Sequence, residues 1–195
     1  NNSVTLVGAA NMTVNNLKAD VSASTATGNL TINADTVNPT SVSVSTGSGA
    51  DTITTSSGDD YVNGNGGADL ISTDGGNDTI DAQTGADTVS AGTGTDYIYA
   101  GNGIGSVDGG DGTDTMGVYG ISGLADNKLV NVENIEVRSG GVTNDLSLQT
   151  EGFNIFFGSG VTTGTVVGGS GNDTITGGTG DNSLTGGGGA DSIMA

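Results

Sequence analysis

The chain has 195 residues, of which 22 are aspartate or glutamate and 3 are lysine or arginine, so its formal net charge is -19. A surface this acidic argues against nucleic-acid binding, because phosphate recognition needs a basic footprint. The absence of histidine and cysteine removes most catalytic triads, zinc sites and disulfide frameworks from consideration.

Residues 1–45 are rich in serine, threonine and asparagine and are predicted to form short strands. The strands expected there are Val4 to Val7, Met12 to Val14, Leu30 to Ile32 and Val42 to Val44. Pro39, the only proline, is placed in a connection between strands. No acidic residue recurs regularly here, so we predict β-solenoid rungs without calcium that cap or continue the repeats after them.

An aspartate recurs every nine residues across residues 46–117. The aspartates are Asp51, Asp60, Asp69, Asp78, Asp87, Asp96 and Asp114, and Gly105 is the only lapse. Two residues after these nine-residue positions come the apolar residues Ile53, Val62, Ile71, Ile80, Val89, Ile98, Val107 and Met116. One short strand and one glycine-rich turn therefore recur together.

A unit of nine residues is too short to bury its own apolar side chain, so copies must stack and share a core. A turn of about six residues and a strand of about three fill the unit, so two units complete one coil. We therefore predict an all-β fold, a parallel β-solenoid whose turns alternate between two edges. One edge carries Asp51, Asp69 and Asp87, and the other carries Asp60, Asp78, Asp96 and Asp114.

Stacking places the carboxylates of one edge about 4.7 to 4.9 Å apart per strand, where bare charges repel. Bound calcium would neutralise that repulsion, because it accepts about six to eight oxygens and glycine turns offer carbonyls beside the carboxylates. Magnesium fits less well, since it demands a near-ideal octahedron. Calcium is therefore the predicted cofactor.

Residues 118–167 interrupt the period. Alternation from Leu129 to Val137 predicts one strand, and all three phenylalanines lie close together at Phe153, Phe156 and Phe157. We expect these rings to pack the interruption. The period returns in residues 168–195 with Asp173 and Asp191, and this second block is expected to continue beyond residue 195.

The repeats resemble those of the repeats-in-toxin (RTX) family, written G-G-x-G-x-D-x-U-x with U a large apolar residue. Residues 168–176 read GGSGNDTIT, and residues 186–194 are nearly as close. Residues 46–54 (TGSGADTIT) and 91–99 (AGTGTDYIY) keep the last glycine and the aspartate but replace the first glycine. Residues 177–185 carry Asn182 in the aspartate position.

The resemblance implies a parallel β-roll in which calcium lies between same-edge turns, held by aspartates of both turns and by turn carbonyls. The implied pairs are Asp51 with Asp69, Asp69 with Asp87, Asp60 with Asp78, Asp78 with Asp96, Asp96 with Asp114, and Asp173 with Asp191. Gly105 is expected to weaken or empty the site beyond Asp87, and Asn182 to give a weaker site because its amide is uncharged.

Folding and calcium binding are expected to be one event, because low hydrophobicity with high net charge disfavours a compact metal-free chain. Extracellular calcium modules work at about 10⁻⁴ to 10⁻³ M, so we predict folding after secretion, outside the cell or at the bacterial cell surface. An unfolded chain also suits type I secretion through a narrow channel. No transmembrane helix is expected.

Three uses of such a roll remain open. The first, which we favour, is a structural protein of the bacterial cell surface of the surface-layer (S-layer) kind, which self-associates into a lattice. The second is a secretion and folding module of a separate enzyme or toxin, and the third is a stiff segment of an adhesin. A cell-surface polysaccharide, bound through another domain, is a further candidate partner. Acids outside the repeat position that could hold intermolecular ions are Asp59, Asp74, Asp81, Asp108, Asp111 and Asp181.

Catalysis by a carboxylate pair is the remaining enzymatic reading, as in β-helical proteins that act on polysaccharides. The candidate acids are Asp59 with Asp60, Asp108 with Asp111, and Glu133 with Glu136. Asp60 already has a calcium assignment, and the two glutamates fit a strand surface better. We therefore predict that the chain is not an enzyme. Tyr61, Tyr97 and Tyr99 flank core positions, where they are read as exposed β-formers rather than as a carbohydrate platform.

Overall fold

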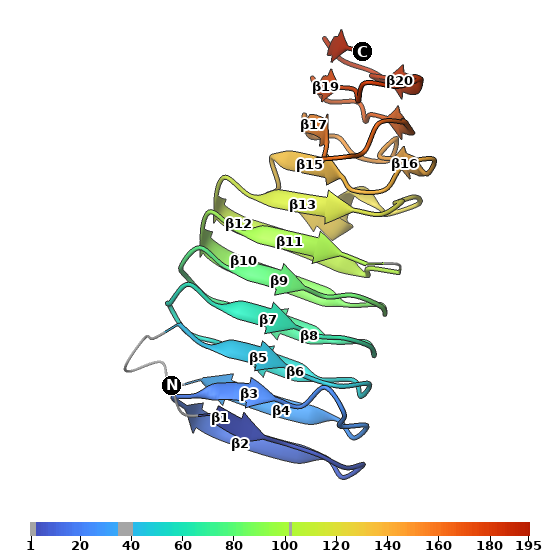
Figure 1. The fold of residues 1–195 in the computed structure, drawn as a ribbon. Coiled ribbons are helices and arrows are strands. Elements are labelled where there is room, and N and C mark those ends of the chain that lie inside the picture. The colour runs from blue at the N-terminus through green and yellow to red at the C-terminus, as the bar shows by residue number, and fades with distance from the viewer. Residues whose placement is uncertain (1–2, 35–40, 102) are drawn as a thin grey trace.

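The chain winds into a parallel β-solenoid of about 10 turns, which rises from β1 and β2 at one end to β21 at the other (Figure 1). The computed structural model describes residues 3–34, 41–101 and 103–195. In these residues the structure has strands and one short 3-10 helix, Asp126–Lys128, and no α-helix. No helix in the described part is long and apolar enough to cross a membrane.

Odd-numbered strands form one wall, an 11-stranded sheet. Its strands are β1 (Ser3–Thr5), β3 (Asp20–Ser22), β5 (Ser43–Ser45), β7 (Tyr61–Asn63), β9 (Thr79–Asp81), β11 (Tyr97–Ala100), β13 (Thr115–Val118), β15 (Asn134–Val137), β17 (Asn154–Phe157), β19 (Thr174–Thr176) and β21 (Ser192–Met194). All neighbours pair in parallel, because the chain returns to this wall once per coil.

Even-numbered strands form a 7-stranded sheet and then a separate 3-stranded sheet. The first contains β2 (Met12–Leu17), β4 (Leu30–Ala34), β6 (Thr52–Thr54), β8 (Leu70–Ser72), β10 (Thr88–Gly94), β12 (Ser106–Gly112) and β14 (Leu129–Val130). The second contains β16 (Thr143–Asp145), β18 (Gly164–Val167) and β20 (Asn182–Thr185). After β14, the even-numbered strands therefore belong to a different sheet.

Strand register confirms that two nine-residue units complete one coil. On the odd-numbered wall Val62 pairs with Ile80 and Ile80 with Ile98, a step of eighteen residues. On the other wall Ile53 pairs with Ile71 at the same step. These side chains are at most 1% exposed, so the repeated apolar residue of every unit adds one layer to a continuous core.

Coils lengthen in the interruption. Met116 pairs with Ile135, and Ile155 pairs with Ile175, which makes steps of nineteen and twenty residues. Phe153 is 3% exposed and Phe157 packs against the core, so two of the three phenylalanines fill this wider part as expected. Phe156 is on the outer side of its strand and only partly buried.

Two strand predictions need correction. The alternating stretch from Leu129 to Val137 is two strands, β14 and β15, on different sheets. The chain turns between them at Asn131, which has a φ of 54°. Near the start, a strand that the sequence did not predict, β3, pairs with β1 and β5. The predicted connection at Pro39 lies outside the described residues.

Glycine lets the turns of neighbouring coils touch. Gly92 has a φ of 107°, and a Cβ there would overlap the carbonyl oxygen of Asp74 in the previous coil. Gly8 has the same φ of 107° but nothing within 4 Å of its missing Cβ. The two glycines therefore have the same positive φ, and only Gly92 is in close contact with a neighbouring coil.

We predict that Gly92→Ala destabilises the folded chain more than Gly8→Ala does. Each alanine adds strain of about 1 kcal/mol at positive φ, and only Gly92→Ala adds an overpacking cost of about 1 to 3 kcal/mol. Denaturant unfolding in saturating calcium measures both. Equal losses of stability would show that backbone strain, and not contact between coils, limits the turns.

Candidate metal centres

Each repeated aspartate lies directly before a strand, at the end of a glycine-rich turn. Asp51, Asp69 and Asp87 precede strands of the 7-stranded sheet, whereas Asp60, Asp78, Asp96, Asp114, Asp173 and Asp191 precede strands of the long sheet. Eight of these nine side chains are at most 3% exposed, and only Asp191 is intermediate. Acidic side chains are almost never buried so fully without a partner.

A ladder of hydrogen bonds joins aspartates of neighbouring coils. The backbone N–H of Asp51 donates to Oδ1 of Asp69 at 2.8 Å, and that of Asp69 donates to Oδ1 of Asp87 at 2.9 Å. On the other edge the same bond links Asp60 to Asp78, Asp78 to Asp96, Asp96 to Asp114 and Asp173 to Asp191, at 2.7 to 2.9 Å. The structure thus brings together all six aspartate pairs named from the sequence.

The second carboxylate oxygen has no such partner. Oδ2 is buried and accepts no hydrogen bond in Asp51, Asp60, Asp69, Asp78, Asp96 and Asp114. A buried, unpaired carboxylate oxygen is costly, and a row of them at the same repeat position needs a common explanation. A cation between the coils would satisfy these atoms.

Turn carbonyls lie next to the carboxylates. A Cβ on Gly67 would overlap the carbonyl oxygen of Gly49 and approach Oδ1 of Asp69 to 3.0 Å. At Gly85, one coil further, a Cβ would meet the carbonyl oxygen of Gly67 and Oδ1 of Asp87 in the same way. Glycine at this turn position therefore lets a carbonyl of one coil lie near a carboxylate of the next.

Side chains alone do not complete a metal site here, and the available mixture of carboxylate and carbonyl oxygens suits calcium. Within residues 3–34, 41–101 and 103–195, no three side chains of His, Cys, Asp or Glu are grouped closely enough to hold a metal ion. Each pair supplies two carboxylates, so a metal here would need backbone carbonyls as well. Mixed carboxylate and carbonyl oxygen sites are typical of calcium.

Burial makes the metal-free carboxylates weak acids. It raises the pKa of Asp69 and Asp78 to about 7, and the negative charges of the aspartates one coil away add to the rise. The pKa of Asp114 rises to about 6 for the same main reason, with Asp96 and Glu133 contributing. Burial also raises the pKa values of Asp60, Asp87, Asp96 and Asp173.

The row of carboxylates stops at three places. Gly105 takes the position after Asp87 and offers no side chain, and its N–H donates to the carbonyl of Asp87 instead. Asn182 pairs in register with Gly164, so its neighbour in the preceding coil brings no carboxylate. Phe153 takes the aspartate position before β17, where its N–H donates to Oδ1 of Asp173.

Glu133 is a candidate that the sequence reasoning missed. It lies directly before β15, and its Oε2 accepts the N–H of Asp114 at 2.8 Å, the same bond that the aspartates make. The sequence pattern alone favours a strand surface for this residue. A signal was present, because Glu133 precedes the buried Ile135 by two residues, as each aspartate precedes its apolar residue.

Comparison with known families gives one match. A model described as the RTX calcium-binding nonapeptide repeat matches four stretches, residues 45–80, 72–107, 81–116 and 165–195, which together cover just over half of the chain. The searches of curated proteins and of solved structures found no match. The matched stretches contain all nine aspartates named above.

We predict that the metal-free fold gains stability as pH falls from 8 to 5. A raised pKa means that the folded chain binds more protons than the unfolded chain, so stability is present at low pH and is lost as pH rises through about 6 to 7. Circular dichroism in calcium-stripped buffer should show β structure increasing on acidification.

Asp69→Asn and Asp78→Asn together provide the control for this pH effect, since an amide keeps the Oδ1 acceptor and cannot titrate. Their combination should flatten the pH dependence between pH 6 and 8. More β structure at pH 8 than at pH 5 in the unsubstituted, metal-free chain would contradict the conclusion that burial raises the pKa values of these carboxylates.

Proposed function

Because the chain belongs to the family of RTX calcium-binding nonapeptide repeats, we propose that its repeated aspartates hold calcium ions between successive coils of the solenoid. The observation that carries this proposal is the buried, unpartnered Oδ2 of six of these aspartates. The proposed ligand residues are Asp51, Asp60, Asp69, Asp78, Asp87, Asp96, Asp114, Asp173 and Asp191.

Calcium supplies positive charge at the edges of the roll. Six ions, one for each aspartate pair, would add about twelve positive charges and take the formal charge from -19 to about -7. The chain's own residues form the sites and the core. Aspartates position their oxygens between coils, glycines let carbonyls approach, and the apolar columns close the core once the edges no longer repel.

Glu133 extends the column on the long-sheet edge. Glu133 accepts the N–H of Asp114 just as each aspartate accepts the N–H of the aspartate one coil earlier. We therefore propose that Glu133 and Asp114 together bind the last calcium ion of the first block. The side chain of Glu133 is exposed, unlike those of the aspartates, and it is one methylene longer. A site there would be more open to water than the sites between aspartates.

The biological role that we propose is a calcium-dependent structural module of a secreted protein at the bacterial cell surface, of the surface-layer kind. Coupling of folding to calcium keeps so acidic a chain unfolded where calcium is scarce, and lets it fold where calcium reaches about 10⁻⁴ to 10⁻³ M. The proposed work of the roll is mechanical, since its nine repeated aspartates hold the coils together. We assign it no reaction.

We also propose that the folded rolls associate with one another through calcium. Asp59, Asp111 and Asp181 are exposed and lie outside the aspartate position of the repeat. Asp59 Oδ1 accepts the N–H of Asn77 one coil later, a bond that asparagine at position 59 can keep. Such acids on neighbouring molecules can share calcium, which would join rolls into a lattice. Calcium would then act twice, first within each roll and then between rolls.

Calcium titration calorimetry on single variants tests the stacking order. Asp78 belongs to two pairs and Asp173 to one, so Asp78→Ala should remove about two bound ions and Asp173→Ala about one. Glu151→Ala, an exposed acid outside the matched repeats, should change neither count nor affinity. If Asp78→Ala and Asp173→Ala lose the same number of ions, the proposed pairing is wrong.

Assembly is tested separately, by light scattering recorded with circular dichroism during a calcium titration. We expect β structure to form first and scattering to follow at higher calcium, with magnesium producing neither. A triple variant, Asp59→Asn with Asp111→Asn and Asp181→Asn, should fold normally and scatter less. Folding of the unsubstituted chain without scattering would reject the lattice and favour a secretion module or an adhesin segment.

A further inference from the structure

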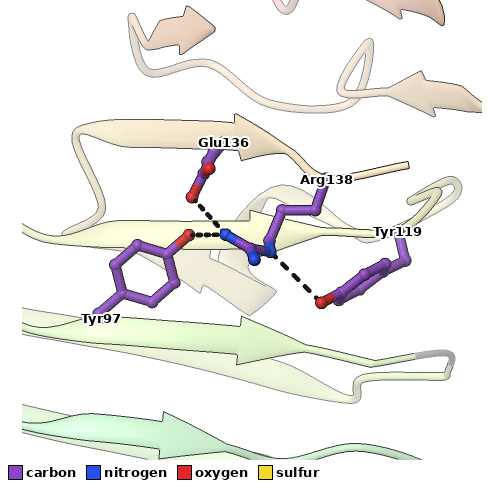
Figure 2. A network of polar contacts seen from close by, with 4 residues as sticks. All are labelled: Tyr97, Tyr119, Glu136 and Arg138. Atoms are coloured by element: carbon purple, nitrogen blue, oxygen red, sulfur yellow. Dashed lines mark hydrogen bonds and ion pairs between the residues drawn. The ribbon is translucent and has the colours of Figure 1, made fainter. Parts of the chain in front are cut away.

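An aromatic and polar cluster lies on the outer face of the long sheet, away from the aspartate edges. Arg138, the only arginine of the chain, lies among Tyr97, Tyr119 and Glu136 (Figure 2). Its Nη1 donates to the Tyr97 hydroxyl at 3.1 Å and to Oε2 of Glu136 at 3.0 Å, and its Nε donates to the Tyr119 hydroxyl at 3.3 Å. The cluster joins three coils, those of β11, β13 and β15.

The same arginine also orders a second ring. Its guanidinium carbon lies 4.9 Å from the centroid of the Tyr99 ring, and the Tyr97 and Tyr99 rings are 4.5 Å apart. Gly117 leaves room for this arrangement, because a Cβ there would lie 2.7 Å from Cδ of Arg138. The tyrosine hydroxyls and rings are therefore held in place before any ligand arrives, which lowers the entropy cost of binding.

A hollow of about 400 Å³ borders this cluster. Asp81, Gln83 and Thr84 line it from the coil of β9, Gly101 from the next coil, and Tyr119 from the coil after that. Gly101 lets the two coils approach closely beside the hollow, because a Cβ there would overlap the carbonyl oxygen of Gln83. The volume lies within the range of about 300 to 1,000 Å³ that is typical of small-molecule sites.

The groups around the hollow suit a sugar. Tyr119 is 44% exposed and offers an aromatic face, against which the C–H side of a pyranose can pack. Asp81, Gln83 and Thr84 line the same hollow. Gln83 Nε2 donates to Oδ1 of Asn63 and Thr84 Oγ1 donates to the carbonyl of Asn65, which fixes both side chains. Their oxygens, with the Asp81 carboxylate, are left as acceptors for sugar hydroxyls. Aromatic packing on one side and fixed polar groups on the other are what a polyhydroxylated ring requires.

Charge narrows the class of sugar. The chain carries a formal charge of -19, and the arginine beside the hollow is already in an ion pair with Glu136. An anionic polysaccharide would meet net repulsion there. We propose that this hollow binds a neutral hexose unit of a polysaccharide, directly on the roll. The site is separate from the calcium-binding edges and goes beyond the proposed structural function.

Titration of the calcium-loaded chain with maltohexaose, cellohexaose and mannohexaose tests this site, by calorimetry and by saturation-transfer NMR, with polygalacturonate as the anionic comparison. We expect at least one neutral oligosaccharide to bind and polygalacturonate not to bind. Tyr119→Ala and Gln83→Gly should each weaken binding about tenfold, through loss of the ring and of the amide. Gln83 has a φ of 59°, so glycine fits there without strain.

Two further variants separate binding from stability. Tyr119→Phe loses the bond to Arg138 but keeps the ring, so sugar affinity should stay within about twofold. Tyr61→Ala removes an exposed tyrosine of the same sheet outside the hollow and should leave affinity unchanged. The proposal is overturned if none of the three oligosaccharides binds, if only polygalacturonate binds, or if Gln83→Gly and Tyr119→Ala both bind like the unsubstituted chain.

Discussion

The bond on which the rest of the structure depends runs from the backbone N–H of one aspartate to the Oδ1 of the aspartate one coil later. The bond matches the eighteen-residue coil of the regular block, and eight of the nine repeated carboxylates are buried along it. The consequence is a column of buried negative charge on each edge, with Oδ2 left unpaired. A chain built this way needs a cation to be stable at neutral pH, because burial opposes the ionised form of these acids.

In the interruption, where the bond between aspartates is missing, apolar packing and the contacts of Arg138 hold neighbouring coils together. Phe153 takes the aspartate position in the interruption and packs into the core. The step between coils there lengthens to nineteen or twenty residues on the odd-numbered wall and to twenty-two on the even-numbered side. The Arg138 cluster ties three coils together beside the same region (Figure 2). The interruption thus depends less on charge and metal than the repeats around it. Its Tyr119 and Arg138 form an aromatic cluster with Tyr97 and Tyr99 of the first repeat block.

Much of the fold and of the candidate site followed from the nine-residue period. The spacing of Asp60, Asp78 and Asp96 predicted same-edge stacking, and the register of β7, β9 and β11 agrees. The stretch from Leu129 to Val137 was misread because a solenoid corner can alternate like a strand, with Val132 buried at the turn between β14 and β15. Glu133 was missed for a related reason. Glu133 is not an aspartate, and it lies nineteen residues after Asp114, outside the regular period of eighteen.

By itself, then, the sequence determined the coil of two units, the apolar column, the six aspartate pairs and the preference for calcium, because a strict repeat turns local spacing into spatial stacking. Only the tertiary structure decided that Oδ2 is buried without a partner, that a third sheet follows β14, and that Arg138 meets Tyr97 across 41 residues of chain. The first of these features depends on how closely neighbouring coils pack around each carboxylate. The other two depend on packing between segments that share no period. Their positions are set by the summed lengths of irregular coils, which no local pattern encodes.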